Sequence, residues 1–332
     1  MKRVRVAFVS LADSTFVQRD REILREAFEV RRVLVRGWRS IPRLVWSVLR
    51  SDVAFSWFAQ DHAYGACRLA ELLGKKSVVV VGGVDAARIP ELGYGEHIKP
   101  SAAARSRYTL ARSDRVLVVD DFLREEISRN AGVRRPEIVT VPLGFDPNVF
   151  RPDGGPRSNV LTAGIVTDVN VRRKGLDTFV EAARRLAELP FRLVGATPSR
   201  ATERLRESAS PNLTFVPVLA PDALLEEYRR ARVYVQASLY EGLPSALGEA
   251  MACGCVPVGT RAGGIPSLIG DTGVFVPAGN PDALATAIRT AYADLDGSKA
   301  RDRIAQVFPL ERRRQALQTI IRELAENQLG RD

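Results

Sequence analysis

The stretch Val233-Tyr-Val-Gln-Ala-Ser-Leu-Tyr-Glu-Gly-Leu-Pro-Ser-Ala-Leu-Gly-Glu-Ala-Met-Ala-Cys-Gly254 sets the organisation of the second half of the chain. Its first six residues form an apolar run typical of a buried strand, which Gly242 and Pro244 interrupt. Proline fits the first turn of a helix, so residues 244–252 are predicted to be helical, and Gly254 suits a left-handed helix end. The stretch therefore predicts a strand, a loop and a helix in succession.

Two carboxylates flank the start of this predicted helix. Glu241 lies in the loop before it and Glu249 lies inside it. The free N–H groups at a helix N-terminus and the positive end of its dipole form an anion site. Carboxylates on either side of a phosphate site suit a sugar nucleotide, which carries hydroxyls on both sides of its phosphates. The same spacing is also typical of a surface helix with two solvated glutamates.

Length and composition indicate a globular protein of two domains. The chain has 332 residues, 45% of them hydrophobic and 27% charged. No apolar run approaches the length of a membrane span, and the start lacks the layout of a signal peptide. Three cysteines provide no disulfide framework, which favours a reducing compartment. We therefore expect a cytoplasmic protein.

The formal net charge of +10 favours an anionic partner, and the charge is concentrated in one segment. Residues 31–50 contain no acid, and Trp38 and Trp46 are interleaved with aliphatic residues. This composition is typical of a segment that lies on an anionic membrane surface, at the inner face of the membrane for a cytoplasmic protein. It is also typical of a half-buried helix with an exposed basic face. The basic residues are Arg31, Arg32, Arg36, Arg39, Arg43 and Arg50.

Strands and helices alternate in both halves of the chain, which predicts parallel βαβ units in two doubly wound α/β domains. We expect domains at 1–145 and 159–332, a linker at 146–158 within a Pro- and Gly-rich stretch, and a last helix that packs back on the first domain. Strands are predicted at 4–10, 30–35, 52–57, 76–81, 115–119, 138–141, 160–163, 191–194, 213–216, 233–236, 256–259 and 273–276. Helices are predicted at 16–28, 62–73, 99–111, from 121 onward, and at 176–187, 202–208, 223–230, 244–252, 281–292 and 310–324.

Other motifs give weaker signals. Cys253-Gly-Cys255 has no second pair nearby, so no zinc site is predicted. Asp294-Leu-Asp296 looks like a metal-binding pair but follows an amphipathic helix rather than a strand. His62 and His97 lack metal-ligand spacing and are predicted to be polar residues of a cleft or the surface. No Walker loop and no nucleic-acid recognition module is present in the sequence.

Four motifs occur in a characteristic order: residues 139–150, then Gly164 with Lys174-Gly175, then Glu241 to Gly254, then Gly263-Gly264-Ile-Pro266. This ordered set resembles glycosyltransferase family 4, a family of retaining enzymes. The resemblance covers nearly the whole chain and is most specific over residues 139–291. It implies the GT-B fold, in which two Rossmann-like domains face each other across a cleft.

The resemblance also implies roles for individual residues. Glu241 would hold the donor-sugar hydroxyls, Glu249 would accept hydrogen bonds from the ribose, and Lys174 would neutralise the diphosphate leaving group. The small residues around Gly164 and at the helix start would let the backbone approach the donor. The helix-start residues are Gly242, Leu243, Pro244 and Ser245.

The chain departs from the family pattern at one donor-side position. Relatives usually carry an arginine just after the glycine that matches Gly164, and here that residue is Ile165. Arg172 and Arg173 are candidates to replace it, and we favour Arg173; a solvated basic loop is the alternative. By analogy with the family, backbone groups around Val218 would meet the nucleotide base.

The first half departs more strongly. Where many relatives have a glycine-rich loop after the first strand, this chain offers Ser14 and Thr15, which suit either phosphate binding or a simple helix cap. Where relatives place a histidine after the fourth strand, this chain has Asp85, a candidate to position the acceptor or take its proton, or else a turn cap. The following loop could line the acceptor side through Glu91, Tyr94 and Glu96.

Together these features predict a retaining, metal-independent glycosyltransferase that uses a nucleoside diphosphate sugar such as a UDP- or GDP-sugar and needs no cofactor. The expected acceptor is a hydroxyl of a lipid-linked or polysaccharide molecule, and nucleic acid is not an expected partner. Two alternatives remain at this point. One is an epimerase or phosphorylase of the same fold, and the other is an inert protein that binds sugar nucleotides.

Overall fold

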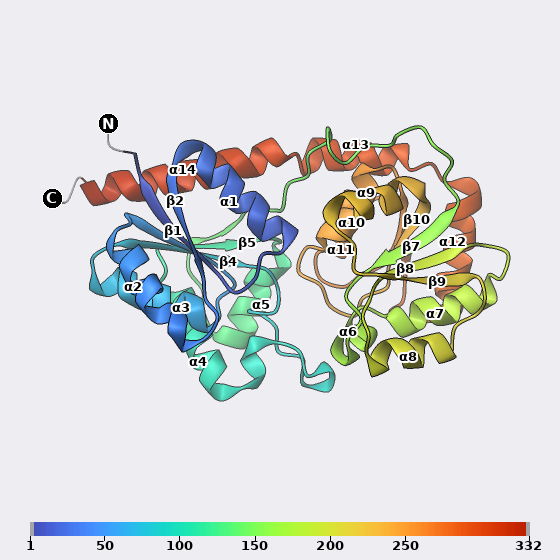
Figure 1. Cartoon of the computed structure of the whole chain (residues 1–332), viewed down its shortest axis with the longest axis horizontal. Coiled ribbons are helices and arrows are strands. Elements are labelled where there is room, and N and C mark those ends of the chain that lie inside the picture. Colours follow the sequence, from blue (N-terminus) through green and yellow to red (C-terminus); the bar gives the residue numbers. More distant parts are fainter. Residues whose placement is uncertain (1–2, 330–332) are drawn as a thin grey trace. The chain divides into compact units, whose positions relative to one another are not determined.

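The computed structural model describes residues 3–329, which divide into two compact units (Figure 1). Unit 1 comprises the chain up to Leu143 together with the segment from Leu310 onward, and unit 2 comprises Gly144–Pro309. Each unit contains one six-stranded sheet with helices on both sides. The predicted α/β class is therefore confirmed, and each unit is described separately below.

Unit 1 is a parallel sheet of strand order β2-β1-β3-β4-β5-β6. Its central strands are buried apolar runs such as Lys76–Val81, as expected for a sheet covered on both faces, whereas the edge strand β2 is mostly half-buried. The elements are β1 (Arg5–Ser10), α1 (Thr15–Ala27), β2 (Glu29–Leu34), α2 (Ile41–Leu49), β3 (Val53–Trp57), α3 (Asp61–Leu72), β4 (Lys76–Val81), α4 (Pro100–Arg112), β5 (Arg115–Val118), α5 (Phe122–Ala131), β6 (Ile138–Thr140) and α14 (Leu310–Leu329), with short 3-10 turns at Trp38–Ser40, Pro90–Leu92 and Glu96–Ile98.

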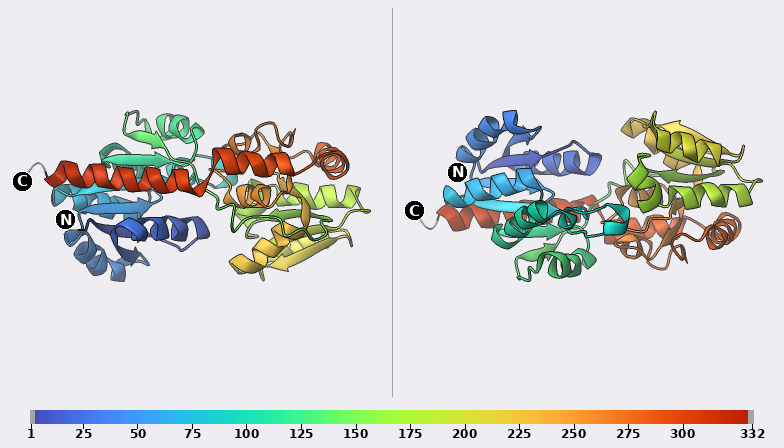
Figure 2. Two further views of the ribbon diagram at one scale, coloured as in Figure 1. Left: turned by 90° about the horizontal axis from the view of Figure 1, so that it is seen from above. Right: turned by 90° about the horizontal axis from the view of Figure 1, so that it is seen from below.

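The long helix α14 is tied to unit 1 by a buried ion pair. It lies along unit 1 (Figure 2) and contacts α1, β3 and β4. Both side chains of the Arg313–Asp20 pair are 1% exposed, and their closest N–O distance is 2.6 Å. The guanidinium group also donates to the carbonyl oxygens of Val141 and Pro142, just before the boundary between the units. These contacts satisfy a charge that would be costly to bury alone.

Unit 2 is a second parallel sheet, of strand order β12-β11-β10-β7-β8-β9. Its core packs apolar residues of the sheet against α7 and α12. The elements are β7 (Asn159–Ala163), α6 (Asp168–Arg173), α7 (Leu176–Arg185), β8 (Phe191–Ala196), α8 (Arg200–Glu207), β9 (Leu213–Pro217), α9 (Pro221–Arg230), β10 (Ala231–Gln236), α10 (Ser245–Ala252), β11 (Val256–Thr260), α11 (Ile265–Ile269), β12 (Val274–Val276), α12 (Pro281–Asp294) and α13 (Ser298–Val307).

Each sheet has one point at which the chain reverses the direction in which it adds strands. In unit 1 this switch point lies between β1 and β3, and in unit 2 it lies between β7 and β10. Loops that leave neighbouring strands at a switch point diverge to opposite faces, which opens a crevice at the carboxyl ends of those strands. The loops after β1, β3, β7 and β10 are therefore the candidate ligand-binding loops.

The structure adds helices that the sequence pattern did not predict, namely α6, α11 and α13, and it forms α2 within the basic segment. The helix α10 begins at Ser245, one residue later than expected, with Pro244 as the residue before it. Gly254 adopts the expected left-handed conformation, with a φ of 81°. None of the helices within residues 3–329 combines the length and the hydrophobicity of a transmembrane span.

Candidate functional site

The carboxyl end of β10 delivers a cluster of polar side chains to the switch point of unit 2. Gln236 ends the strand, and the following loop carries Ser238 and Glu241 before α10 begins. One carboxylate oxygen of Glu241, Oε1, accepts hydrogen bonds from Ser238 Oγ at 3.1 Å and Gln236 Nε2 at 3.2 Å. The carboxylate is therefore held in one orientation just after the carboxyl end of β10.

Two cations from the end of α6 complete the surroundings of Glu241. Lys174 Nζ donates to Glu241 Oε1 at 2.8 Å, and a guanidinium nitrogen of Arg173 lies 3.2 Å from Oε2. Burial alone would raise the pKa of Glu241, but the charges of Lys174 and Arg173 outweigh it and hold the pKa below its usual value. Glu241 is therefore an ionised, buried acceptor at neutral pH.

Lys174 reaches Glu241 because two glycines leave room for it. A Cβ on Gly164, at the end of β7, would lie 2.7 Å from Lys174 Cδ, so the lysine side chain crosses directly over this glycine. Gly175 has a φ of 62°, and a Cβ there would lie 2.3 Å from the carbonyl oxygen of Ala237. The two glycines thus serve different purposes: Gly164 admits the lysine side chain, and Gly175 admits the backbone after β10.

Arg173 has a different environment from the one that the sequence suggested. Its guanidinium group is buried and donates to the carbonyl oxygen of Tyr240 at 3.0 Å and to Asn170 Oδ1. Together with the ion pair to Glu241, these contacts hold the loop after β10. The guanidinium group therefore does not face an open ligand site. The geometry therefore favours Arg173 as a positioning residue. Ile165 is 52% exposed, and Arg172 is the exposed member of the arginine pair.

Glu249 is positioned by a buried tyrosine of α9. Tyr228 Oη donates to Glu249 Oε2 at 3.2 Å, and both side chains are buried. Burial first, and then the charge of Glu249, raise the pKa of Tyr228, so the hydroxyl keeps its proton and remains a donor. Gly248, on the same helix as Glu249, leaves room for the ring of Phe145: a Cβ at this position would lie only 2.1 Å from the ring.

The helix start between the two glutamates is closely packed. Gly242, Leu243 and Pro244 are buried, and Ser245 is half-buried at the first position of α10. The carbonyl oxygen of Gly242 accepts from the N–H of Gly264 at 2.9 Å, which ties this loop to the Gly-Gly motif. The first-turn N–H groups of any helix lack acceptors within the helix, so they can bind an anion.

Two further features lie at the same edge of this sheet. Val218, which is 57% exposed, follows directly after β9. A pocket of about 530 Å³ opens at the ends of β10, β11 and β12, and it is lined by Leu239, Arg261 and Phe275 among others. Its size is in the range of small-ligand pockets. The guanidinium group of Arg261 stacks on the Phe275 ring, with the Cζ atom 4.2 Å from the ring centre.

In unit 1, Asp85 is fully buried and its carboxylate oxygens already accept hydrogen bonds from the backbone. Its oxygens accept from the backbone N–H groups of Ala59, Gly82 and Gly83 at 2.8 to 3.1 Å. Burial raises the pKa of Asp85 to about 6, against the lowering effect of these donors. The side chain thus ties together the loops after β3 and β4. Direct contact with an acceptor, as expected from the sequence, has no support in this geometry, so we assign Asp85 a positioning role.

The switch point of unit 1 presents a hydroxyl-bearing helix start and an aromatic residue. Ser14 precedes α1 without capping it through its side chain, and Thr15 is exposed. Phe58, directly after β3, has a φ of 66°, which is the one positive value among the described non-glycine residues. Its ring packs on Gly82 and lies 6.3 Å from the Phe16 ring. Such backbone strain costs about 1–3 kcal/mol and is concentrated at functional sites.

The loop after β4 brings some of the predicted acceptor-side residues to a pocket. Glu96 accepts from Gln60 Nε2 at 2.9 Å and, with Lys99, lines a pocket of about 490 Å³. His62 and His97 are buried rather than exposed, which differs from the expectation. Burial lowers the pKa of both, to about 4 for His62, so both rings are neutral and structural.

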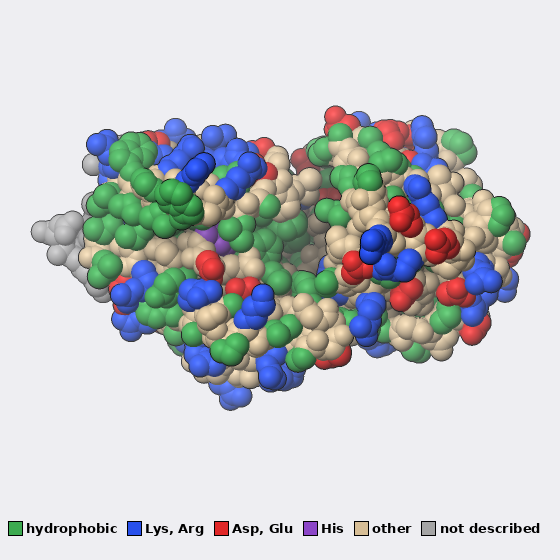
Figure 3. All heavy atoms as spheres, turned by 60° about the horizontal axis from the view of Figure 1, so that its bottom comes forward, with side chains coloured by type: hydrophobic (Ala, Val, Ile, Leu, Met, Phe, Trp, Pro, Cys, Tyr) green, Lys and Arg blue, Asp and Glu red, His purple; other side chains and the backbone are tan. Residues whose placement is uncertain are grey.

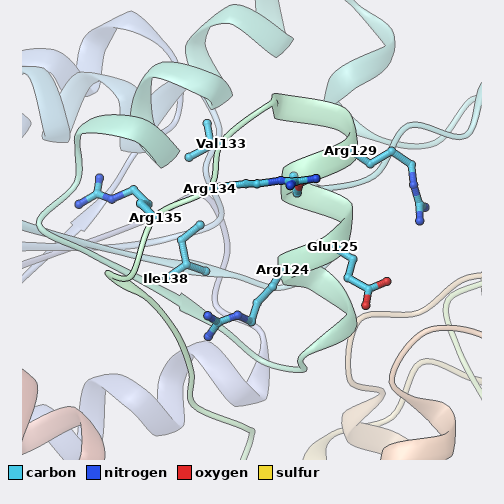
Figure 4. A pocket seen from close by; sticks show the side chains of 8 residues that line it. Arg124, Glu125, Arg129, Val133, Arg134, Arg135 and Ile138 are labelled. Carbon is cyan, nitrogen blue, oxygen red and sulfur yellow. The ribbon is translucent and has the colours of Figure 1, made fainter.

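A larger pocket in unit 1, of about 580 Å³, lies at the opposite edge of the sheet, where β6 begins (Figure 4). Several arginines line it, but their guanidinium groups do not converge: Arg129 and Arg135 point in opposite directions (Figure 4). Arg129 pairs with Glu126 and Arg135 with Glu137. These positions do not form a site for a phosphate.

The sequence did not single out four of the residues described above. Gln236 and Ser238 hold Glu241, Tyr228 holds Glu249, and Phe58 carries the strained backbone. A signal exists for two of them, since Gln236 is a polar residue at the end of a largely apolar strand and Ser238 follows two residues later. Tyr228 and Phe58 give no such signal, because each is typical of an ordinary core position.

Two family models match successive parts of the chain. A family model described as Glycosyltransferase Family 4 matches residues 2–149, and a model described as Glycosyl transferases group 1 matches residues 158–294. Alpha-maltose-1-phosphate synthase from Mycolicibacterium smegmatis is 29% identical over 237 residues, which cover 61% of this chain and 61% of that protein. The chain spans between 44% and 61% of the length of three curated relatives that it matches.

Solved structures share the fold over almost the whole chain. Sucrose-phosphate synthase from Thermosynechococcus elongatus superposes with a TM-score of 0.78 and 19% identity, covering 97% of this chain and 99% of that chain. HepE from Anabaena, solved in complex with UDP-glucose, gives a TM-score of 0.80 and 15% identity, covering 96% and 99%. This likeness confirms the GT-B fold class. With family models matching both halves, the chain belongs to the glycosyltransferases, family 4 in its first half and group 1 in its second.

Proposed function

We propose that this protein transfers a sugar from a nucleoside diphosphate sugar to an acceptor hydroxyl, with retention of the anomeric configuration. The observation that carries the proposal is the Lys174–Glu241 pair, which lies at the switch point of the unit 2 sheet beside the first turn of α10. A fixed cation, a helix N-terminus and an ionised acceptor at one crevice match the three parts of a sugar nucleotide.

The positive groups bind the diphosphate. Lys174 directs one of its three N–H donors to Glu241 and keeps two for phosphate oxygens. The first-turn N–H groups of α10 add donors and a dipole that favours negative charge. Both groups are held before the reaction begins, so they stabilise the charge that develops on the leaving diphosphate without reorganisation.

The carboxylates bind the hydroxyls on either side. Glu241 is ionised and has oxygens that accept from sugar hydroxyls, and Glu249 accepts from the ribose while Tyr228 holds its other oxygen. Val218 and its neighbours at the end of β9 would contact the base. The UDP-glucose held by HepE, which shares this fold, supports a nucleotide-sugar donor.

In the transfer step, the bond between the anomeric carbon and the diphosphate oxygen breaks, and a bond to the acceptor oxygen forms on the same face. The proton of the acceptor hydroxyl passes to the departing diphosphate oxygen. Because Lys174 and α10 supply the positive charge, we propose that no divalent cation takes part. We also place the reaction in the cytoplasm, where the three buried free cysteines stay reduced.

The test is a transfer assay with UDP-glucose, GDP-mannose and ADP-glucose as donors and alkyl glycosides as acceptors. Proton NMR of the product reports the anomeric configuration, and a parallel reaction contains EDTA. An α-linked product from an α-linked donor, formed equally well with EDTA, supports the proposal. Formation of the β product, or loss of turnover with EDTA that added Mg²⁺ restores, contradicts it.

A second candidate is a protein that binds sugar nucleotides without transferring the sugar. The observation that favours it is the exposed Ile165 where relatives carry arginine, together with the commitment of Arg173 to the Tyr240–Glu241 loop. Calorimetry with the same donors separates the two functions. Micromolar binding without sugar transfer or donor hydrolysis would favour the inert protein. Replacing Arg172 by alanine then tests whether this exposed arginine takes the place of the missing one.

A further inference from the structure

The sugar-nucleotide site makes no use of an apolar and basic patch on unit 1. We call it the α2 surface and define its apolar part as Trp38, Ile41, Trp46 and Leu49, and its basic part as Arg36, Arg39, Arg43 and Arg50. Trp38 is 76% exposed, and the other three apolar side chains are 47% to 54% exposed. In Figure 3, hydrophobic side chains gather on the face that carries α2, with Lys and Arg side chains around them.

The helix α2 is apolar on both of its faces. Leu44 and Val48 are buried against the unit, as expected for a surface helix. The opposite side carries Trp46 and Leu49, at positions where a surface helix of a soluble protein normally carries polar residues, and Ile41 is exposed at the first residue of the helix. Packing within the unit explains the inner face only. The outer face has the composition of a surface that contacts something apolar.

The charge around this face has one sign. No acid occurs between Glu29 and Asp52, and among residues 3–329 no carboxylate pairs with any arginine of the α2 surface. The Arg50 guanidinium carbon lies 5.1 Å from the Trp46 ring centre, and that of Arg39 lies 5.5 Å from the Trp38 ring centre. The arginines thus lie beside the aromatic rings and keep their charge available to an anionic partner.

We propose that the α2 surface docks on an anionic lipid bilayer. Tryptophan is the side chain that prefers the boundary between lipid headgroups and acyl chains, and arginines beside it reach the phosphates. A short helix with an apolar outer face and a basic rim lies in that boundary without crossing the membrane. A nucleic acid would use the arginines but would leave the aliphatic side chains without a role.

The docking does not depend on sugar transfer. One consequence does rest on the proposed function: a docked transferase would meet lipid-linked acceptors, whose sugars lie at the membrane surface. Membrane binding and donor binding are therefore measured separately, so that failure of one leaves the other standing.

Intrinsic fluorescence gives a direct test, because the chain has three tryptophans and the third, Trp57, is 1% exposed. The full chain is mixed with vesicles of phosphatidylcholine alone or with one third phosphatidylglycerol. Docking predicts a blue shift with the anionic vesicles and quenching by lipids brominated in the acyl chain. Zwitterionic vesicles should bind much more weakly, and salt should reduce the binding.

Two variants test the basic part and the apolar part separately. Arg39→Gln/Arg43→Gln should weaken binding to anionic vesicles about 25-fold, since each arginine near the surface contributes roughly fivefold. The matched control, Arg200→Gln/Lys299→Gln, removes the same charge from exposed positions of unit 2 and should bind like the wild type. Trp38→Ser/Trp46→Ser should lose vesicle flotation while its unfolding transition remains cooperative.

Several results would overturn the proposal. Equal flotation of the wild type and Arg39→Gln/Arg43→Gln removes the role of charge, and equal loss in the Arg200→Gln/Lys299→Gln control makes the effect one of net charge. If the wild type sediments as a dimer, Trp38→Ser/Trp46→Ser sediments as a monomer, and neither binds vesicles, a second copy of this chain covers the α2 surface instead of a bilayer. Binding to nucleic acid but not to vesicles would exclude the lipid surface.

Discussion

Replacing Gly164 by alanine should slow sugar transfer strongly while leaving the fold intact. The new Cβ would lie 2.7 Å from Lys174 Cδ and 3.1 Å from Cε. To reach the 3.4 Å of an ordinary contact, Cδ must retreat by about 0.7 Å. The ammonium group lies farther along the same chain, so its 2.8 Å hydrogen bond to Glu241 cannot be kept in its present geometry.

The size of the effect follows from this displacement. A misplacement of about 1 Å at a reacting centre costs roughly 10²-fold in rate, which corresponds to about 2.7 kcal/mol. The cost to folding is smaller, because the displaced atoms belong to a flexible side chain that is 17% exposed. We expect kcat/KM to fall about 10²-fold and the free energy of unfolding to change by less than about 1 kcal/mol.

Gly175→Ala, in contrast, should destabilise the fold. In Gly175→Ala the Cβ would meet a backbone oxygen at 2.3 Å, and the φ of 62° is itself unfavourable for alanine. This variant should lose more than about 2 kcal/mol of unfolding free energy. Urea denaturation and steady-state kinetics on both variants separate the two effects.

A double variant shows whether Gly164→Ala lowers activity by displacing Lys174. If Gly164→Ala acts only by moving Lys174, it should cause no further loss in a Lys174→Ala background, because residues that act through one another are not additive. Near-normal turnover of Gly164→Ala would refute the proposed role of Lys174 in leaving-group stabilisation. Fully additive losses in the double variant would refute the idea that the new Cβ acts by displacing Lys174.

Further predictions concern the residues that support the site and the fold. Tyr228→Phe removes the hydrogen bond to Glu249 and should raise the donor KM roughly fivefold with little change in kcat, as measured by steady-state kinetics. Arg313→Ala leaves Asp20 buried without its cation and should lower the free energy of unfolding by about 3–5 kcal/mol, as measured by urea denaturation. Burial lowers the pKa of His62 to about 4, so below its unfolded pKa the unfolded chain binds a proton that the folded chain refuses, and stability falls as the pH drops from about 6.5 to 4. Across that window His62→Gln should gain up to about 3 kcal/mol relative to the wild type, measured as the difference between two unfolding curves.

Each of these predictions has a control. Arg314→Ala removes an exposed ion pair of the same helix and should cost less than about 1 kcal/mol. The pH comparison uses a difference curve because Asp85, with a raised pKa of about 6, binds its proton more tightly when folded and so acts in the opposite direction. An unchanged donor KM in Tyr228→Phe, equal losses in the two arginine variants, or a His62→Gln difference that does not vary with pH would contradict the reasoning.

The strands were predictable from the sequence because parallel strands buried on both faces read as apolar runs bounded by polar turns. Lys76–Val81 and Val233–Gln236 are examples that the structure confirms. Short helices were not predictable in this way. Asp168–Arg173 has six residues and two valines, which is too little for a helical period to be recognised.

The positions of the site residues along the chain were predictable, but their partners were not. Lys174 and Glu241 are 67 residues apart and meet only because β10 lies beside β7, an order that no local pattern contains. The position of Arg173 depends on α6, whose last turn buries its guanidinium group. Lys174, the next residue, is then the side chain that crosses Gly164. Asp85 does lie at a strand end, but the loop after β3 covers it.

The most direct test of the central claim is calorimetric titration of UDP-glucose, GDP-mannose and ADP-glucose into the wild type, Lys174→Ala and the exposed control Arg200→Ala. We expect the wild type and Arg200→Ala to bind one of these donors with equal affinity, and Lys174→Ala to bind it at least tenfold more weakly, since a buried charge-assisted contact contributes about 1.5–3 kcal/mol. Equal donor affinity in Lys174→Ala and the wild type would contradict the assignment of the Lys174–Glu241 crevice as the sugar-nucleotide site.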